Sequence, residues 1–215
     1  MEERAKRYWN GVADEKTFTH PLRTDWLAAE LAPKARLLDV GCGYGRLTAE
    51  VAAAGWPHVI GVDPAERMID RGRLEHPQLD LRPMPDGRLP VEDASVDAVI
   101  LVSVLTCIPE PGDQESLLRE IERALTPGGH VFFSDLLLQE DERNGARYEE
   151  ALARGEPLGT FRLDEHGGVR LCHFPHERLE ALFAAFEPCR SEEIVVHTMN
   201  GHPARALQAL YRRRG

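Results

Sequence analysis

The hydrophobic and polar positions of residues 22–138 alternate between helix-like and strand-like segments. Helical spacing or a high content of helix-forming residues marks residues 22–32, 47–55, 65–75 and 114–125. Short apolar runs typical of buried strands lie at residues 36–40, 58–63, 96–102 and 130–138, with a weaker one at 79–84. This alternation predicts a doubly wound α/β fold, in which a mainly parallel sheet has helices on both faces.

The C-terminal part of the chain has a different pattern. Residues 139–159 are polar, and residues 159–174 are typical of a hairpin across a Gly-Gly turn. A helix is expected over 176–186, followed by strands at 191–199 and 204–213 joined across Asn200-Gly201. We therefore expect one domain over residues 1–215, with an insertion near 136–175 that caps the substrate side.

Three glycines follow the first predicted strand directly, at Gly41, Gly43 and Gly45. They lie at the carboxyl end of that strand and open the next helix, where doubly wound sheets bind ligands. Glycine lets the backbone approach a ligand closely, and a helix N-terminus offers unpaired N–H groups. A tight turn without a ligand would need one glycine, so three at alternate positions favour a ligand loop.

The net charge and the apolar stretches of the chain indicate which kinds of binding partner are unfavourable. The 215 residues carry a formal net charge of -10, which disfavours nucleic acid or an anionic membrane as the main partner. No apolar stretch is long enough to cross a bilayer, and the N-terminus lacks an apolar signal-peptide core.

The four cysteines are widely separated, which predicts reduced thiols in a cytoplasmic protein. His173 and His176, separated by Pro175 and lacking a second ligand pair, do not predict a metal site.

The spacing of the glycines indicates which ligand the loop binds. A dinucleotide fingerprint would require a glycine where Arg46 stands. The stretch "DVGCGYG", with Asp39 inside the strand, resembles instead the first motif of class I S-adenosylmethionine-dependent methyltransferases. Asp63 ends the next strand, where that family has an acidic residue whose carboxylate accepts both ribose hydroxyls. By itself, Asp63 could equally be a helix cap before Pro64.

The resemblance extends over residues 35–135, including the Pro-Gly-Gly turn before the fifth strand. It implies a seven-stranded sheet whose last strand is antiparallel, a single methyltransferase domain, and S-adenosylmethionine as cofactor with S-adenosylhomocysteine as product. The cofactor contacts that it implies are Asp39, Gly41, Cys42, Gly43, Gly45, Asp63, Pro64, Met68, Met84, Asp86 and Ser103.

The adenine loop departs from the family pattern. The position where the family often has an acidic residue falls on Pro85, and Asp86 comes one residue later. Either a shifted loop lets Asp86 bind the adenine amino group, or Met84 and backbone groups hold the base. Asp86-Gly87 is also typical of an ordinary turn.

The resemblance also implies an SN2 methyl transfer to a small-molecule metabolite. The candidates for the catalytic side are Asp135, which ends the fifth strand, and the histidines His20 and His173, which lie in segments expected to cover the cleft. Residues 1–20 mix aromatic and polar side chains without a sustained period, so we expect a lid over the cleft. The alternative is a helix packed on the back of the sheet.

Two other functional classes remain open from the sequence. One is an NAD-type oxidoreductase, against which Arg46 argues; the other is a catalytically silent module that binds S-adenosylmethionine. The sequence does not identify the methyl acceptor, the nucleophilic atom, any general base or the oligomeric state.

Overall fold

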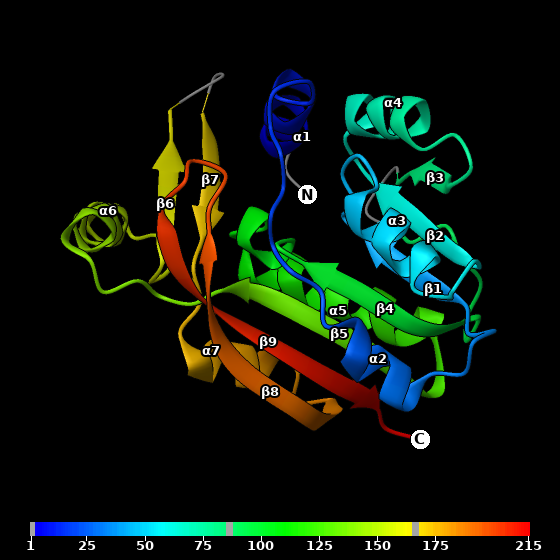
Figure 1. Ribbon diagram of the computed structural model, residues 1–215. Coiled ribbons are helices and arrows are strands. Elements are labelled where there is room, and N and C mark those ends of the chain that lie inside the picture. The colour runs from blue at the N-terminus through cyan, green and yellow to red at the C-terminus, as the bar shows by residue number, and fades with distance from the viewer. Residues whose placement is uncertain (1–2, 85–87, 165–167) are drawn as a thin grey trace.

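A seven-stranded sheet forms the centre of the molecule (Figure 1). The computed structural model describes residues 3–84, 88–164 and 168–215. The strands of this sheet are β1 (Leu37–Val40), β2 (Val59–Asp63), β3 (Asp80–Pro83), β4 (Val96–Val102), β5 (Leu125–Leu136), β8 (Phe186–His197) and β9 (Pro203–Arg213). They lie in the order β3-β2-β1-β4-β5-β9-β8, and β9 runs antiparallel to both of its neighbours. The predicted doubly wound fold with an antiparallel last strand is confirmed.

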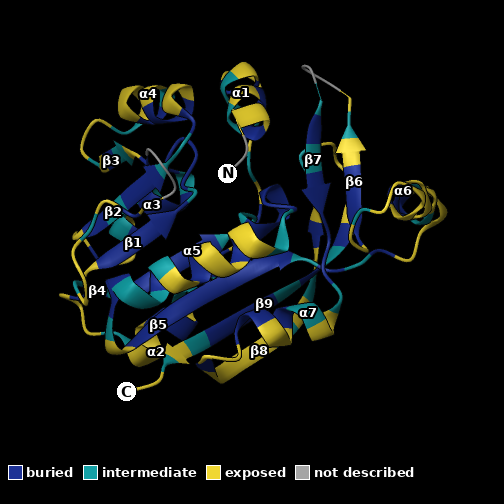
Figure 2. Ribbon diagram, turned by 180° about the vertical axis from the view of Figure 1, so that it is seen from behind, coloured by how far each residue is buried: buried dark blue, intermediate teal, exposed yellow. Residues whose placement is uncertain are grey.

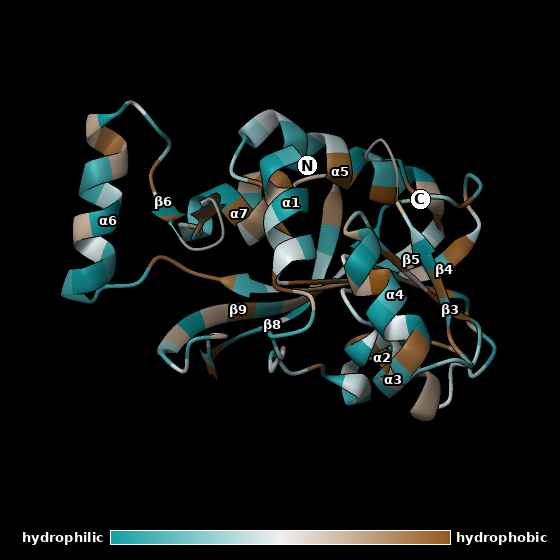
Figure 3. Cartoon of the chain, turned by 90° about the horizontal axis from the view of Figure 1, so that it is seen from above, coloured by the Kyte–Doolittle hydropathy of each residue, from teal (hydrophilic) through white to brown (hydrophobic). Residues whose placement is uncertain are grey.

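Helices cover both faces of the sheet. The helices are α1 (Glu3–Gly11), α2 (Thr24–Glu30), α3 (Arg46–Ala53), α4 (Glu66–Glu75), α5 (Pro111–Ala124), α6 (Glu142–Ala153) and α7 (His176–Leu182), with a short 3-10 turn, η2 (Leu105–Cys107). Seen from above, α2 and α3 lie on one side of the sheet, and α5 and α7 on the other (Figure 3).

Successive residues of the central strands point to opposite faces, and both faces are buried. On β4, Ile100 packs with α2 and α3, whereas Val99 and Leu101 pack with α5 and α7. On β5, Phe132 packs on the face covered by α2 and α3, and Phe133 packs on the face covered by α5 and α7. This two-sided burial explains why these strands are continuous apolar runs rather than alternating ones.

The C-terminal edge of the sheet begins earlier than the sequence predicts. Helix α7 ends at Leu182, and β8 starts at Phe186 instead of residue 191. Phe183 and Phe186 are fully buried together against Tyr211 of β9. Their packing against the sheet competes with the helical propensity of residues 183–186, and it ends the helix there.

Two helices were not expected from the sequence. Residues 3–11 form α1, and the polar stretch after β5 contains α6, whose N-cap Asp141 accepts a hydrogen bond from the backbone N–H of Asn144 at 3.1 Å. Only a narrow face of each helix is buried, and most of α6 is exposed (Figure 2). Such a narrow apolar stripe explains why neither helix stands out in the sequence pattern.

The predicted hairpin is present as a separate two-stranded sheet. Its strands, β6 (Thr160–Leu163) and β7 (Val169–Cys172), pair antiparallel, with Phe161 opposite Leu171. In Figure 1 the hairpin and α6 stand beside α1, above the carboxyl ends of the parallel strands. The hairpin and α6 are therefore placed on the side of the sheet where its parallel strands end.

Candidate active site

A cavity of about 450 Å³ lies at the carboxyl edge of the sheet. This volume is in the range of small-molecule and cofactor sites. The strand ends contribute Asp39, Asp63 and Ser103, while Trp9 and Phe161 come from α1 and β6. The cavity therefore connects the glycine loop with the N-terminal segment and the insertion.

The glycine loop has the conformation that its composition predicts. Gly41, Gly43 and Gly45 have φ of 71°, 56° and 82°, in the left-handed region that favours glycine. Gly41 and Gly43 line the cavity, whereas Gly45 is the N-cap of α3 and packs against Leu81. Gly45 thus shapes the turn rather than the cavity wall.

The two carboxylates expected near the cofactor lie side by side on β1 and β2. Asp39 is buried and accepts a hydrogen bond from Thr48 Oγ1 at 2.6 Å. Asp63 accepts from the backbone N–H groups of Gly43, at 2.9 Å, and Ala65, at 2.7 Å. Asp63 therefore fixes the turn that leads into α4 and also lines the cavity, so a structural role and a ligand role are compatible.

Burial raises the pKa of both carboxylates to about 6. For Asp39, the hydrogen bond from Thr48 opposes this rise and the nearby charge of Asp63 adds to it. For Asp63, the two backbone N–H donors favour the ionised form and limit the rise. The ionised form of Asp63 is therefore the major form near neutral pH.

The remaining cofactor candidates divide into two groups. Cys42, Pro64, Met68 and Met84 line the cavity beside the carboxylates. Asp86 lies outside the residues that the structure describes. The backbone N–H of Met84 donates to the Asp63 carbonyl at 3.0 Å, which fixes the chain just before that loop.

The N-terminal segment crosses the mouth of the cavity. It is attached to α4, where Arg71 Nη1 donates to the carbonyl oxygens of Ala13, at 2.8 Å, and Lys16, at 2.9 Å. At its far end, Thr19 Oγ1 donates to the carbonyl of His197, the last residue of β8, at 2.9 Å. Residues 3–20 therefore lie over the carboxyl edge of the sheet and not on its back.

An aromatic cluster connects this segment to the glycine loop. Phe18 stacks on Tyr44 with ring centroids 5.3 Å apart, and Trp9 meets Phe18 edge-on. A side-chain carbon built on Gly43 would lie 2.6 Å from the ring of Phe18. The neighbour that requires glycine at this position is thus an aromatic side chain of the N-terminal segment.

His20 lies in the cavity between two serines. Its Nε2 is 2.7 Å from Ser134 Oγ, and its Nδ1 is 2.9 Å from Ser103 Oγ. Burial, together with the charge of Arg46, lowers the pKa of His20 to about 4, so its ring is neutral near pH 7. Ser103 has a φ of 56°, an unusual conformation for a residue other than glycine.

Asp135 is fully buried and is not part of the cavity wall. It accepts hydrogen bonds from the backbone N–H groups of Thr106, at 3.0 Å, and Leu136, at 2.8 Å. Burial raises its pKa to about 7. Asp135 holds η2 against the end of β5, and this turn contains the cavity residues Thr106 and Cys107.

His173 faces the cavity from the insertion side. Its Nδ1 is 2.5 Å from the hydroxyl of Tyr148 on α6, and its ring lies against Phe161. Burial and the nearby charge of Arg147 lower the pKa of His173 to about 4. Of the three catalytic candidates, His20 and His173 therefore line the cavity, whereas Asp135 does not.

The described residues give no indication of a metal site or a membrane span. No group of three or more His, Cys, Asp or Glu side chains among them is placed to hold a metal ion. No described helix is both long and apolar enough to cross a bilayer. All four cysteines are free, and burial raises the thiol pKa of Cys42, Cys107 and Cys172.

Several cavity residues were not identified from the sequence. Arg143, Asn144 and Arg147 come from α6, and Thr198 and Met199 from the connection between β8 and β9. The helical spacing of Asn144, Tyr148 and Ala151, which form the buried side of α6, could have indicated this helix. The position of the β8–β9 connection depends on the length and curvature of two long strands, which no local pattern encodes.

Comparison with known proteins places this chain in a family. A family model described as a methyltransferase domain matches residues 38–133. A ubiquinone biosynthesis O-methyltransferase from Acinetobacter baumannii (strain AYE) is 30% identical over 194 residues, covering 82% of this chain and 77% of the relative. The chain belongs to the class I S-adenosylmethionine-dependent methyltransferases.

Further similarities agree with this assignment. A ubiquinone biosynthesis O-methyltransferase from Bordetella bronchiseptica is 35% identical over 176 residues, covering 74% of this methyltransferase and 69% of the relative. The crystal structure of a methyltransferase from Methanosarcina mazei superposes with a TM-score of 0.83 at 20% identity, covering 92% of this chain and 99% of that one. At that identity, the superposition shows a shared fold.

Proposed function

We propose that this methyltransferase transfers the methyl group of S-adenosylmethionine to an oxygen atom of a small-molecule metabolite. The observation that carries the proposal is the cavity wall formed by the glycine loop and Asp63, enclosed by the N-terminal segment. The curated relatives named as O-methyltransferases support oxygen as the accepting atom. A cavity of about 450 Å³, partly covered by the N-terminal segment, supports a small molecule rather than a macromolecule as acceptor.

The residues of the cavity wall fit the cofactor. The Asp63 carboxylate keeps acceptor capacity beyond its two backbone donors, and this capacity suits the ribose hydroxyls. Arg46 lines the cavity, and its Nε is a buried donor without a hydrogen-bond partner among the described residues. Met68 and Met84 provide an apolar, adaptable surface for the base.

When bound, S-adenosylmethionine supplies an activated methyl group, so the protein must position the acceptor and exclude water. We propose that residues 1–20 act as the lid and that residues 136–175 act as the substrate-side cap. The cluster that joins Tyr8 and Val12 to Tyr148 and Phe161 supports this assignment, because it packs the lid against the cap.

The ring nitrogens of His20 each face a serine hydroxyl, so the imidazole fixes the lid to the ends of β4 and β5. We therefore propose that His20 is a positioning residue. The buried Asp135 has the same kind of role for η2, because both carboxylate oxygens accept backbone N–H groups.

Replacing the Asp63 carboxylate tests the ribose contact. We expect Asp63→Ala to weaken S-adenosylmethionine binding by about 1–3 kcal/mol, the scale of a lost hydrogen bond to a charged group, or roughly 5- to 150-fold. Calorimetry measures this change, and circular dichroism controls for folding because the variant also loses the hydrogen bonds from the backbone N–H groups of Gly43 and Ala65. An unchanged dissociation constant would remove Asp63 from the cofactor site.

The raised pKa of Asp63 predicts a pH-dependent affinity. Ribose hydroxyls donate better to the ionised carboxylate, so binding of S-adenosylhomocysteine should weaken as the pH falls through about 6. Well below that pH, the dissociation constant should rise about tenfold per pH unit for a single titrating group. Asp63→Asn should flatten the profile in titrations between pH 5 and pH 8. A profile with the same slope in Asp63→Asn would contradict the assignment.

A catalytically silent module that binds S-adenosylmethionine is the second candidate, and turnover distinguishes the two. The protein is incubated with S-adenosylmethionine and a metabolite extract, and mass spectrometry searches for a compound that gains one methyl group. Formation of S-adenosylhomocysteine together with such a compound supports the transferase. Cofactor binding without either product supports the silent module.

A further inference from the structure

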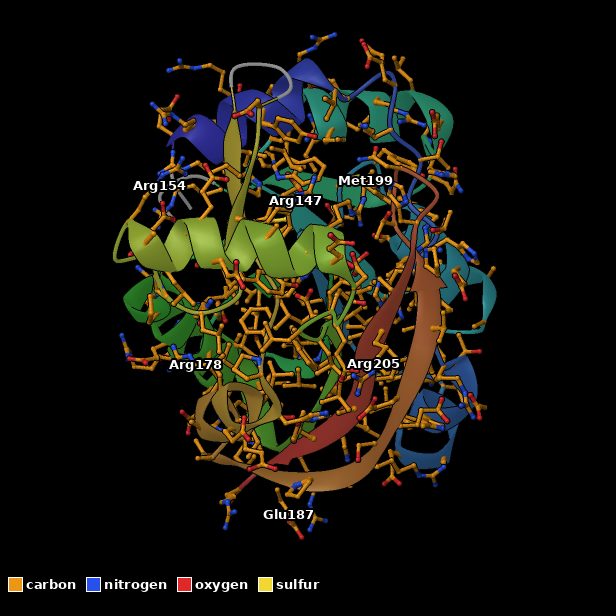
Figure 4. The ribbon with its side chains drawn as sticks, turned by 90° about the vertical axis from the view of Figure 1, so that its left-hand side faces the viewer. Arg147, Arg154, Arg178, Glu187, Met199 and Arg205 are labelled. Carbon is orange, nitrogen blue, oxygen red and sulfur yellow. The ribbon has the colours of Figure 1, made fainter. Side chains whose placement is uncertain are left out.

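The cap presents a cation to the cavity without a carboxylate beside it. Arg147 of α6 lies over Phe161, with its guanidinium carbon 5.5 Å from the ring centroid. No ion pair within residues 3–84, 88–164 and 168–215 involves Arg147, and within those residues its guanidinium donates a single hydrogen bond, to Asn144 Oδ1 at 3.5 Å. By contrast, Arg154 at the end of the same helix pairs with Glu150 at 2.5 Å. Figure 4, which faces α6, labels both arginines.

A neutral histidine adds a hydrogen-bond donor next to this cation. The Tyr148 hydroxyl accepts from the backbone N–H of Gln139 at 3.2 Å, so its proton points to Nδ1 of His173. Because Nδ1 accepts, the neutral ring of His173 carries its proton on Nε2. The low pKa of His173 keeps the ring in this form near pH 7. His173 therefore offers an N–H group to a ligand in the cavity.

The acidic groups of the cavity lie on other elements. The carboxylates in the described lining are Asp39 on β1, Asp63 on β2 and Asp113 on α5. In Figure 1, β1 and β2 lie on the opposite side of α1 from α6. On the cap, the charge of Asp141 at the start of α6 also acts on His173, and Asp141 pairs with Arg143 at 3.9 Å. A negatively charged ligand group is therefore repelled by the cofactor wall and attracted by the guanidinium of Arg147.

We propose that Arg147 and the Nε2–H of His173 form an anion-binding subsite, and that the methyl acceptor is a small aromatic acid whose carboxylate they hold. A guanidinium and a neutral N–H donor suit a carboxylate, which accepts on two oxygens. The apolar body of such an acid fits between Phe161, Leu163 and Leu171, which line the same wall. This inference rests on the proposed function, because it identifies the acceptor side of that cavity.

Matched acids and esters test the subsite by binding rather than by turnover. Benzoate, protocatechuate and phenylacetate, each compared with its methyl ester, are titrated calorimetrically into the protein saturated with S-adenosylhomocysteine. The wild-type protein should bind at least one acid about tenfold or more tightly than its ester, because only the acid carries the charge. Arg147→Ala should abolish this preference, Arg147→Lys should keep part of it, and His173→Phe should reduce it.

Arg154→Ala on the same helix is the matched control and should keep the wild-type preference. S-adenosylhomocysteine also carries a carboxylate, which Arg147 could bind in place of the carboxylate of the acid. Titration of S-adenosylhomocysteine into each variant distinguishes these two possibilities. If Arg147→Ala weakens the cofactor as much as the acid, Arg147 serves the cofactor and the proposal is overturned.

The proposal is also overturned if no acid binds more tightly than its ester in the wild-type protein, or if the preference survives in Arg147→Ala. Failure of the wild-type protein to bind S-adenosylhomocysteine would contradict the proposed function instead. The comparison of acids with esters in the unliganded protein would then still decide whether the subsite exists.

Discussion

Gly43→Val should strongly weaken the binding of S-adenosylmethionine while leaving the domain folded. Gly43 has a φ of 56°, and an added side-chain carbon would lie 2.6 Å from the ring of Phe18. A β-branched side chain in that conformation is strained by about 1–3 kcal/mol. It would also push Phe18 away from Tyr44 and withdraw the N–H that Asp63 accepts. We expect a loss in affinity of about 100-fold or more, the combined scale of one strained residue and one charged hydrogen bond.

Gly128→Val provides the control for backbone strain. Gly128 has a φ of 76°, and the space around its missing side chain is open. It lies in the Pro-Gly-Gly turn before the buried run of β5, at the opposite end of the sheet from the cavity. Both variants should lose stability in thermal unfolding, but only Gly43→Val should lose the cofactor in calorimetry. Equal affinities in the two variants would show that the glycine loop does not form the cofactor wall.

A chain that begins at Pro21 should fold cooperatively and lose methyl transfer. The buried residues of α1 pack with Tyr148 and Phe161, whereas the two large clusters that flank the sheet contain no residue from 3–20. Removing the lid therefore leaves both sheet faces covered. It opens the cavity to water and removes the contacts of His20 with Ser103 and Ser134, which should cost about 100-fold or more in rate.

The truncation is measured by thermal unfolding and by the rate of S-adenosylhomocysteine formation. A matched variant, His20→Ala in the full chain, loses the serine contacts but keeps the aromatic cluster, so its activity should fall between the wild-type and truncated values. Full activity in the truncated chain would exclude a lid. Loss of the cooperative transition would show that residues 1–20 belong to the core.

The parallel half of the sheet could be predicted from the sequence, because local and long-range forces agree there. Residues 98–102 form a continuous apolar run within the predicted strand 96–102, and β4 occupies residues 96–102 between β1 and β5. The C-terminal half was predicted less accurately. Phe183 and Phe186 continue a helical pattern, but their packing against Tyr211 ends the helix at Leu182. Only the tertiary structure reveals that competition.

Cofactor contacts at Gly43 and Asp63 could be predicted from the sequence, because Gly43 lies in the glycine loop after β1 and Asp63 is the last residue of β2. A role for Arg147 could not be predicted in this way. Arg147 reaches the cavity from a helix with a narrow buried face, and its surroundings come from a hairpin and a distant strand connection. The proposed anion-binding role of Arg147 depends on the absence of an ion-pair partner for it in the described part of the chain. Only the folded structure shows that absence.

The central claim is that this cavity binds S-adenosylmethionine and transfers its methyl group to a small molecule. The most direct measurement uses S-adenosylmethionine with an isotopically labelled methyl group, a metabolite extract and the wild-type protein, with Asp63→Ala as the comparison. We predict a labelled small molecule formed in equal amount with S-adenosylhomocysteine, and much less of both with Asp63→Ala. Bound cofactor that releases neither product, or equal turnover in Asp63→Ala, would contradict the account.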